Sequence, residues 1–172
     1  MTTIEDRITI DAPAARIYTL AARVERWPEI LPHYHRVTVL RDGAEERLVE
    51  MAATRDGFPV KWTSTQRLDP VRHTVGYHHV RGVTRGMDVL WTIDPAPDGA
   101  RGALVRIVHD FDPPWPPVVG PLAARYVVCG LFVHDIAVKT LRGIKRVAES
   151  MGAVPAISDS DAPRATPIGR ER

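Results

Sequence analysis

Residues 8–34 read ITIDAPAARIYTLAARVERWPEILPHY, and their pattern passes from strand to helix within a few positions. The preceding and overlapping segment Ile4–Ile10 alternates apolar and polar residues, as a half-buried strand does. Asp11-Ala12-Pro13 then supplies an acidic residue and a proline, which are common at helix starts. Apolar residues at helical spacing predict a helix over about Pro13–Val24. Prolines bracket residues 27–32, so that segment has room for one or two helical turns only.

After residue 35 the pattern changes to β-strands separated by turn signals. Six segments are rich in β-branched or aromatic residues: Val37–Arg41, Arg47–Ala53, Val60–Leu68, His73–Val80, Met87–Ile93 and Ala103–Phe111. Short Asp-Gly connections such as Asp42-Gly43 are typical of neighbouring antiparallel strands. Together with the N-terminal strand, these segments predict an antiparallel sheet of about seven strands.

The longest helical pattern follows Pro121, behind a proline-rich loop at residues 112–117. Its apolar stripe consists of Val133, Ala137, Leu141, Ile144, Ala148 and Met151. A helix of about 30 residues would be about 45 Å long and would cross the whole domain. Gly130 is the expected kink, and Gly152 with Pro155 the expected stop. We expect one domain over residues 1–153 and a disordered tail over residues 154–172, where periodicity is lost.

This order of elements predicts an α+β helix-grip fold. In it, a curved antiparallel sheet of about seven strands wraps around a long C-terminal helix, and two short helices follow the first strand. A single amphipathic helix is too narrow to fill the concave side of such a sheet. The remaining space is therefore the expected ligand site, with a solid core as the alternative.

Composition restricts the partners and the compartment. The 172 residues carry a net charge of +2, and charges alternate in sign along the chain, which does not favour nucleic acid. Cys129 is the only cysteine, so no internal disulfide forms and a reducing cytoplasm is expected. The longest apolar stretch, Tyr126–Val133, is far shorter than the ~20 residues that a membrane span requires.

Several segments resemble the START-like (SRPBCC, Bet v 1-like) superfamily and, within it, the polyketide cyclase/aromatase branch. They are residues 8–34 quoted above, RLDPVRHTV (67–75), HHV (78–80), MDVLWTI (87–93) and HDFD (109–112). The resemblance covers about Ile4 to Met151. It implies an internal cavity that binds an apolar poly-ketone or aromatic intermediate and promotes aldol cyclization and dehydration, a lyase-type reaction. It implies no metal and no organic cofactor, a hydrophobic small-molecule ligand, and an acyl carrier protein as candidate partner.

The resemblance implies two catalytic residues. Arg67 matches a cyclase arginine that points into the cavity and would stabilise an enolate oxygen. Its alternative is an outward arginine paired with a carboxylate, and Trp62 on the same strand has the opposite parity, so both point inward only if a bulge intervenes. Tyr34 matches a tyrosine that donates a hydrogen bond to the substrate, with an ordinary core tyrosine as the alternative.

The remaining expected site residues would bind substrate. They are Trp27, Leu31, Trp62, Met87, Trp91, Ile107 and His134. Met87 and Trp91 share one strand parity, which makes their inward placement self-consistent. His134 lies on the long helix, where it would shuttle protons or, alternatively, form a surface or capping group.

Other motifs do not indicate a different chemistry. His33 and His35 share a face if extended, while His78 and His79 alternate, and no ligand set for a metal follows from them. His109-Asp110 is a His/Asp pair, but the sequence has no Gly-x-Ser-x-Gly elbow and Cys129 lies in an expected apolar helix, so nucleophilic catalysis is not indicated. Residues 82–86 lie between strands, unlike a phosphate-binding loop. Two other functions remain open: a non-catalytic carrier of a lipid, quinone or other hydrophobic molecule, and an interaction protein acting on a macromolecule.

Overall fold

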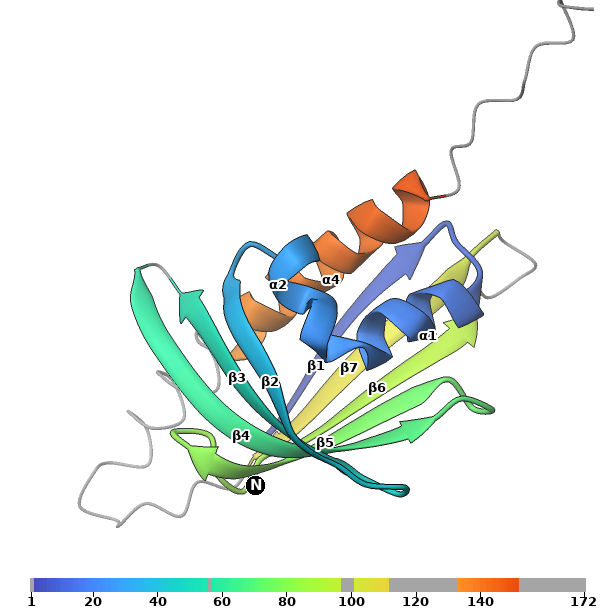
Figure 1. Cartoon of the computed structure of the whole chain (residues 1–172). Coiled ribbons are helices and arrows are strands. Elements are labelled where there is room, and N and C mark those ends of the chain that lie inside the picture. Colours follow the sequence, from blue (N-terminus) through green and yellow to red (C-terminus); the bar gives the residue numbers. More distant parts are fainter. Residues whose placement is uncertain (1, 56, 97–100, 112–132, 152–172) are drawn as a thin grey trace, which may run out of the picture.

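The computed structural model describes residues 2–55, 57–96, 101–111 and 133–151. Its elements, in chain order, are β1 (Thr2–Ile10), α1 (Ala14–Ala22), η1 (Val24–Arg26), α2 (Trp27–Ile30), β2 (Tyr34–Asp42), β3 (Arg47–Arg55), β4 (Phe58–Asp69), β5 (Thr74–Gly82), β6 (Asp88–Pro95), β7 (Ala103–Phe111) and α4 (His134–Ser150). Each expected strand is present, and so are the two short helices after the first one. The predicted α+β helix-grip fold is confirmed (Figure 1).

The strands form one antiparallel sheet in the order β1-β7-β6-β5-β4-β3-β2. Because β1 and β2 lie at opposite edges, the chain between them has to cross the sheet, and α1, η1 and α2 make that crossing. The sheet curves, and α4 lies over its concave side, where it contacts β1, α1 and α2 (Figure 1). The space between the sheet and α4 is where a ligand site is expected.

Alternation decides which side chains face α4. Along β7 every second residue is buried, from Ala103 through Ile107 and His109 to Phe111, and the residues between them are partly exposed. Burial of the apolar members contributes about 1.5–3 kcal/mol for each large side chain. The period-two pattern that predicts the strand therefore also identifies its inner face.

The stripe expected on the C-terminal helix is buried from Val133 to Ala148, whereas Met151 at the C-terminal end of α4 is 57% exposed and does not belong to it. The helix approaches α2 closely because residue 143 is glycine. A Cβ at Gly143 would lie 2.2 Å from Leu31 Cδ2. The predictions for Cys129, Gly130 and the tail at residues 154–172 fall outside the described residues.

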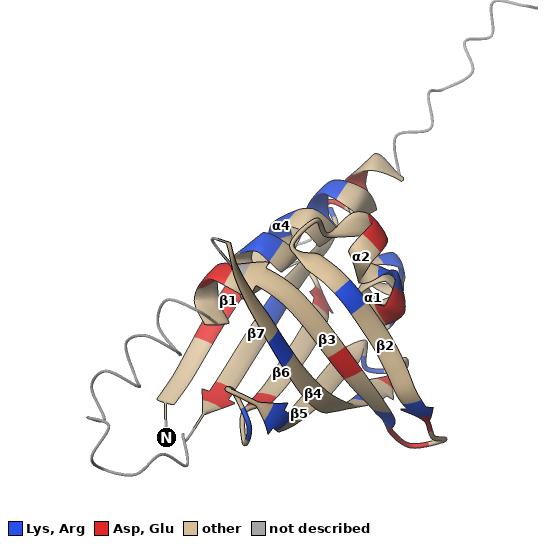
Figure 2. Ribbon diagram, turned by 60° about the vertical axis from the view of Figure 1, so that its left-hand side comes forward, with Lys and Arg blue, Asp and Glu red and all other residues tan. Residues whose placement is uncertain are grey.

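Charged residues of both signs are interspersed along the ribbon, and α4 carries several Lys and Arg residues (Figure 2). Within the described ranges, no helix is long and apolar enough to cross a membrane. The same ranges contain no cluster of three or more His, Cys, Asp or Glu side chains arranged to hold a metal ion.

Candidate functional site

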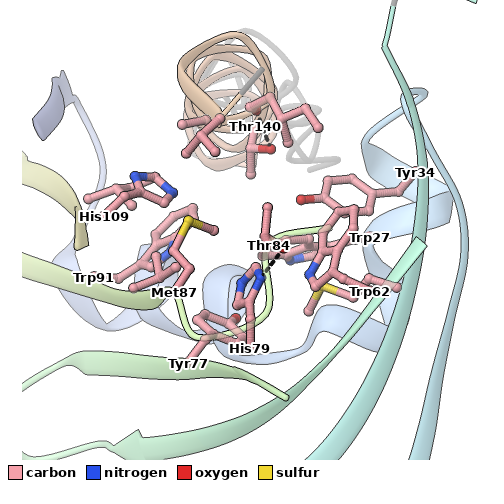
Figure 3. A pocket seen from close by; sticks show the side chains of 16 residues that line it. Trp27, Tyr34, Trp62, Tyr77, His79, Thr84, Met87, Trp91, His109 and Thr140 are labelled. Carbon is pink, nitrogen blue, oxygen red and sulfur yellow. Dashed lines mark hydrogen bonds between the residues drawn. The ribbon is translucent and has the colours of Figure 1, made fainter. Parts of the chain in front are cut away.

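A cavity of about 70 Å³ lies between the concave side of the sheet and α4. On this scale one water needs roughly 10–15 Å³, so the cavity has room for several. Its walls come from nearly every element: Trp27, Tyr34, Met51, Trp62, Tyr77, His79, Thr84, Met87, Val89, Trp91, Ile107, His109, Val133, Ile136, Ala137 and Thr140. Figure 3 shows these side chains surrounding an open centre. The described lining contains no Lys, Arg, Asp or Glu.

One side of the cavity is a cluster of packed rings. Trp27 meets Tyr34 edge to face with 4.9 Å between ring centroids, and its centroid lies 5.9 Å from that of Trp91. Tyr34 in turn lies 6.1 Å from Trp62, again in an edge arrangement. Ring pairs at these separations are stabilising by about 0.5–1.5 kcal/mol beyond the area they bury. The cluster forms a rigid aromatic wall suited to a flat or unsaturated ligand.

His79 enters the cavity from β5, stacked on Trp62 with the two rings 8° apart and 6.0 Å between centroids. A hydrogen bond of 2.6 Å joins its Nδ1 to Thr84 Oγ1 (Figure 3). Thr84 reaches this place because the β5–β6 connection folds back, with the Gly86 N–H donating to the His79 carbonyl. Burial lowers the pKa of His79 to about 3, so the ring is neutral near pH 7.

His109 enters from β7, on the opposite side of the cavity from Trp62 (Figure 3). Burial lowers its pKa to about 4, and the charge of His134 acts in the same direction. Its Nδ1 is buried without a hydrogen-bond partner. The cavity thus holds two imidazoles, His79 and His109, that are neutral near pH 7 and, because of their lowered pKa, accept a proton less readily than a free histidine unless a negative charge forms beside them.

Tyr34 directs its hydroxyl into the cavity from the first residue of β2 (Figure 3). Burial raises its pKa well above the usual range, although hydrogen bonding to Thr140 opposes this, so the phenol stays protonated and able to donate. Thr140 Oγ1 also lies 2.9 Å from His33 Nε2, and burial lowers the pKa of His33 to about 4. Tyr34 is therefore a protonated hydroxyl on the cavity wall, in hydrogen-bond contact with Thr140.

The structure brings most of the sequence-predicted site residues together. Those that line the cavity are Tyr34, Trp27, Trp62, Met87, Trp91 and Ile107. Their parts in binding or catalysis stay predictions. Three others, Arg67, Leu31 and His134, lie outside the lining.

The prediction that Arg67 points into the cavity is wrong. Its side chain is 78% exposed, and its Nε lies 3.4 Å from Glu46 Oε2. The bulge that would have turned it inward lies on the neighbouring strand, where the register skips Val80 of β5, so β4 keeps its alternation. The inward residue at this level is Gln66, which is fully buried and donates to the Tyr77 hydroxyl.

Leu31 and His134 also differ from their expected places. Leu31 is fully buried but packs at the close approach of α2 and α4 near Gly143, so it serves the core. His134 is 55% exposed in the first turn of α4, with its Nδ1 2.6 Å from Asp6 Oδ1. Of its alternatives, a surface or capping group, the structure shows the surface group.

The two cavity histidines were missed as site residues. His109 has the parity of Ile107, and His79 has the parity of Tyr77, so alternation along β7 and β5 places both with residues of the inner face. His78, of the other parity, points outward and pairs with Asp88 at 2.7 Å. The signal was therefore present in the strand pattern.

Comparison with known proteins agrees with this architecture. Residues 10–125 match the family described as polyketide cyclase/dehydrase and lipid transport. The chain belongs to this family. Within the polyketide cyclase/dehydrase and lipid transport family, the granaticin polyketide synthase bifunctional cyclase/dehydratase of Streptomyces virginiae is 34% identical over 112 residues, covering 64% of this chain and 36% of that protein. The actinorhodin polyketide synthase bifunctional cyclase/dehydratase of Streptomyces coelicolor is 33% identical over 102 residues, covering 58% and 31%.

The chain thus spans about a third of the length of these two relatives. Among solved structures, the Zhui aromatase/cyclase from Streptomyces sp. R1128 superposes with a TM-score of 0.77 at 23% identity, covering 89% of this chain and 96% of the other. At that identity the similarity shows the fold, and it extends over almost the whole of both chains. This polyketide cyclase/dehydrase and lipid transport family member therefore has the fold of that aromatase/cyclase.

Proposed function

We propose that this chain binds a poly-ketone segment in its cavity and promotes aldol ring closure followed by dehydration. The observation that carries the proposal is the pair of neutral imidazoles, His79 and His109, that face an aromatic-lined cavity together with the Tyr34 hydroxyl. A cavity used only for storage has no need of proton acceptors on opposite walls. The names of the cyclase/dehydratase relatives support the same chemistry.

The reaction needs proton transfer and positioning only. A base takes a proton from a methylene flanked by two carbonyls, and the resulting enolate carbon attacks another carbonyl carbon to form the new C–C bond. The alkoxide oxygen takes up a proton. Loss of that oxygen as water, with a proton from the adjacent carbon, leaves a double bond in the ring. No oxidant or reductant is involved, and the overall change is the loss of one water.

Each step has a suitable group in the cavity. His109 or His79 accepts the methylene proton, and the imidazolium formed is stabilised by the adjacent enolate in a low-dielectric site. Tyr34, whose pKa is raised, remains a donor to the enolate or ketone oxygen. The described lining lacks a cation, so hydrogen bonds take the part that the sequence interpretation had given to Arg67.

The alternative is a carrier of a neutral apolar molecule. The uncharged lining favours it, because an apolar ligand would lose no charge–charge contact on entering or leaving. The family description names lipid transport beside cyclization. Under this alternative, the histidines only contribute shape and weak polarity to the wall.

The two functions separate in a reconstituted assay. We would combine the protein with a ketosynthase and an acyl carrier protein that make a poly-β-ketone chain, and measure the ratio of cyclized to spontaneously formed products by liquid chromatography and mass spectrometry. His109→Gln, His79→Gln and Tyr34→Phe are expected to lower the enzyme-dependent product by about 10²-fold or more where the group acts in proton transfer or oxyanion stabilisation.

His78→Gln is the matched control, since this histidine precedes His79 but faces outward. It is expected to leave the product ratio unchanged. Apolar-probe binding to all variants, measured with 8-anilinonaphthalene-1-sulfonate, reports the cavity itself. If the wild type binds the probe and leaves product ratios unaltered, the chain is a carrier and the cyclase proposal is wrong. The acyl carrier protein as physiological partner, and the cytoplasm as location, belong to this proposal as well.

A further inference from the structure

Two buried polar atoms on neighbouring strands have no hydrogen-bond partner: Asp6 Oδ2 on β1 and His109 Nδ1 on β7. Asp6 is 6% exposed and His109 is 8% exposed. An unpaired buried donor or acceptor costs about 1–3 kcal/mol, more if it is charged. Two such atoms close together therefore call for a common explanation.

The strand register makes Asp6 and His109 neighbours. Asp6 is opposite Ile107, and Ile4 is opposite His109. Asp6 and His109 are therefore diagonal neighbours in the antiparallel pair of β1 and β7. Both are on the inner face, since both are buried within alternating strands. Diagonal neighbours have Cα atoms about 7–8 Å apart, within reach of long side chains and of a single bridging water.

The other oxygen of Asp6 is already engaged. His134 Nδ1 lies 2.6 Å from Asp6 Oδ1 and, as a donor, holds the carboxylate at the start of α4. Burial raises the pKa of Asp6, while the charge of His134 and its hydrogen bond lower it. The charges that act on His109 are those of Asp110, which raises its pKa, and His134, which lowers it. With Oδ1 bound to His134, only Oδ2 remains to serve His109.

We propose that Asp6 is a positioning residue for His109: the His109 Nδ1–H donates a hydrogen bond to one bridging water, and that water donates a hydrogen bond to Asp6 Oδ2. The proton is thereby held on Nδ1, and the lone pair is held on Nε2. Because Nδ1 is buried while the ring lines the cavity, Nε2 is on the edge that faces a ligand. His109 is then a proton acceptor in the correct tautomer before any substrate arrives.

This assignment deepens the proposed function, because it names the nitrogen that would take the substrate proton. It is tested without substrate, so its failure is separate from that of the cyclase proposal. If Asp6 holds the proton on His109 Nδ1, the Nδ1–H tautomer of His109 has a spectroscopic signature that depends on Asp6. An Asp6–His134 pair with a purely structural role would not produce that dependence. At pH 7 the signature is readable, since the lowered pKa of His109 keeps its ring neutral.

The experiment is a two-bond ¹H–¹⁵N correlation spectrum of the full chain labelled with [¹⁵N]histidine, with the His109 signals assigned from their loss in His109→Gln. We expect wild-type His109 to be mainly the Nδ1–H form. Asp6→Leu, nearly isosteric and without an acceptor, is expected to shift His109 to mainly the Nε2–H form. Glu5→Gln, which removes a carboxylate from the outer face of the same strand, is expected to leave the tautomer unchanged.

A second variant distinguishes the two carboxylate oxygens of Asp6, of which Oδ1 binds His134 and Oδ2 is assigned to His109. His134→Gln retains Asp6 Oδ2 and is expected to keep the Nδ1–H form. A mainly Nε2–H ring in the wild type would overturn the proposal, and that measurement stands even where Asp6→Leu fails to fold. A folded Asp6→Leu protein with an unchanged His109 tautomer would overturn it equally.

Discussion

Acidification to pH 5 tests the two buried imidazoles directly. Burial lowers the pKa of His79 to about 3 and that of His109 to about 4, against 6.5 for an unperturbed histidine. As the pH falls through 6.5, the unfolded chain therefore takes up protons at these positions while the folded protein does not. The stability contributed by the neutral rings is complete above pH 6.5 and is lost as the pH falls toward 4.

The magnitude follows from this difference. At pH 5 the unfolded chain is protonated at both positions and the folded protein at almost neither, so each histidine lowers the free energy of unfolding by ~2 kcal/mol relative to pH 7.5. Together they account for ~4 kcal/mol, a large part of the 5–15 kcal/mol that is typical of a domain. The raised pKa of Asp6 acts in the opposite direction, because the native carboxyl then binds a proton more readily than the unfolded one.

Urea unfolding followed by circular dichroism at pH 7.5, 6.5, 5.5 and 5.0 measures this dependence. His79→Gln and His109→Gln are each expected to reduce the difference between pH 7.5 and pH 5 by ~2 kcal/mol, whatever their effect at pH 7.5. His78→Gln, on the outer face, is the control and should retain most of the wild-type difference, because it removes only the smallest of the effects that lower the pKa of His79. If both cavity variants retain it too, these rings are not buried and neutral as described, and the argument for proton acceptors in the cavity fails.

Two further predictions concern Arg67 and Gly143. Arg67→Ala should change stability by less than ~1 kcal/mol and leave the affinity for 8-anilinonaphthalene-1-sulfonate unchanged, since the exposed pair with Glu46 is a surface ion pair; a tenfold loss of probe affinity in a titration would contradict the outward placement. Gly143→Ala should destabilise the protein by ~1–3 kcal/mol in urea unfolding, although alanine normally favours a helix by ~1 kcal/mol, because the added Cβ would lie 2.2 Å from Leu31 Cδ2. In a Leu31→Ala background, Gly143→Ala should lose most of that penalty. A stabilising Gly143→Ala would show that the helices are not in close contact. Arg142→Ala, on the exposed side of α4, is the control.

The order of elements could be predicted because it depends on near neighbours in the chain. Alternation marks the strands, and apolar residues at helical spacing mark the helices, so every strand and both short helices were expected close to where they lie. The same rule placed Met87 and Trp91 on the inner face. Applied to His79 and His109, it would have found them as well.

The face of the sheet on which a side chain lies was harder to predict where a β-bulge changes the inward–outward alternation along a strand. In β2 the register shifts between Tyr34 and Arg36, so Tyr34 is buried although the later inward residues, Val37 and Val39, have the opposite parity. In β5 a shift passes over Val80, while β4 remains regular and Arg67 stays outward. A bulge depends on the pairing of two strands, and one strand's sequence does not specify it.

The chain's local pattern alone was enough to specify the strands, the short helices, the amphipathic C-terminal helix and the inner face of most strands, because these follow from the spacing of apolar side chains along neighbouring residues. Only the tertiary structure decided that rings from α2, β2, β4 and β6 meet around a cavity, that Arg67 faces water, and that His79 and His109 stay neutral. The physical reason is that packing, desolvation and the resulting pKa shifts depend on residues distant in sequence, which the curved sheet and α4 bring together.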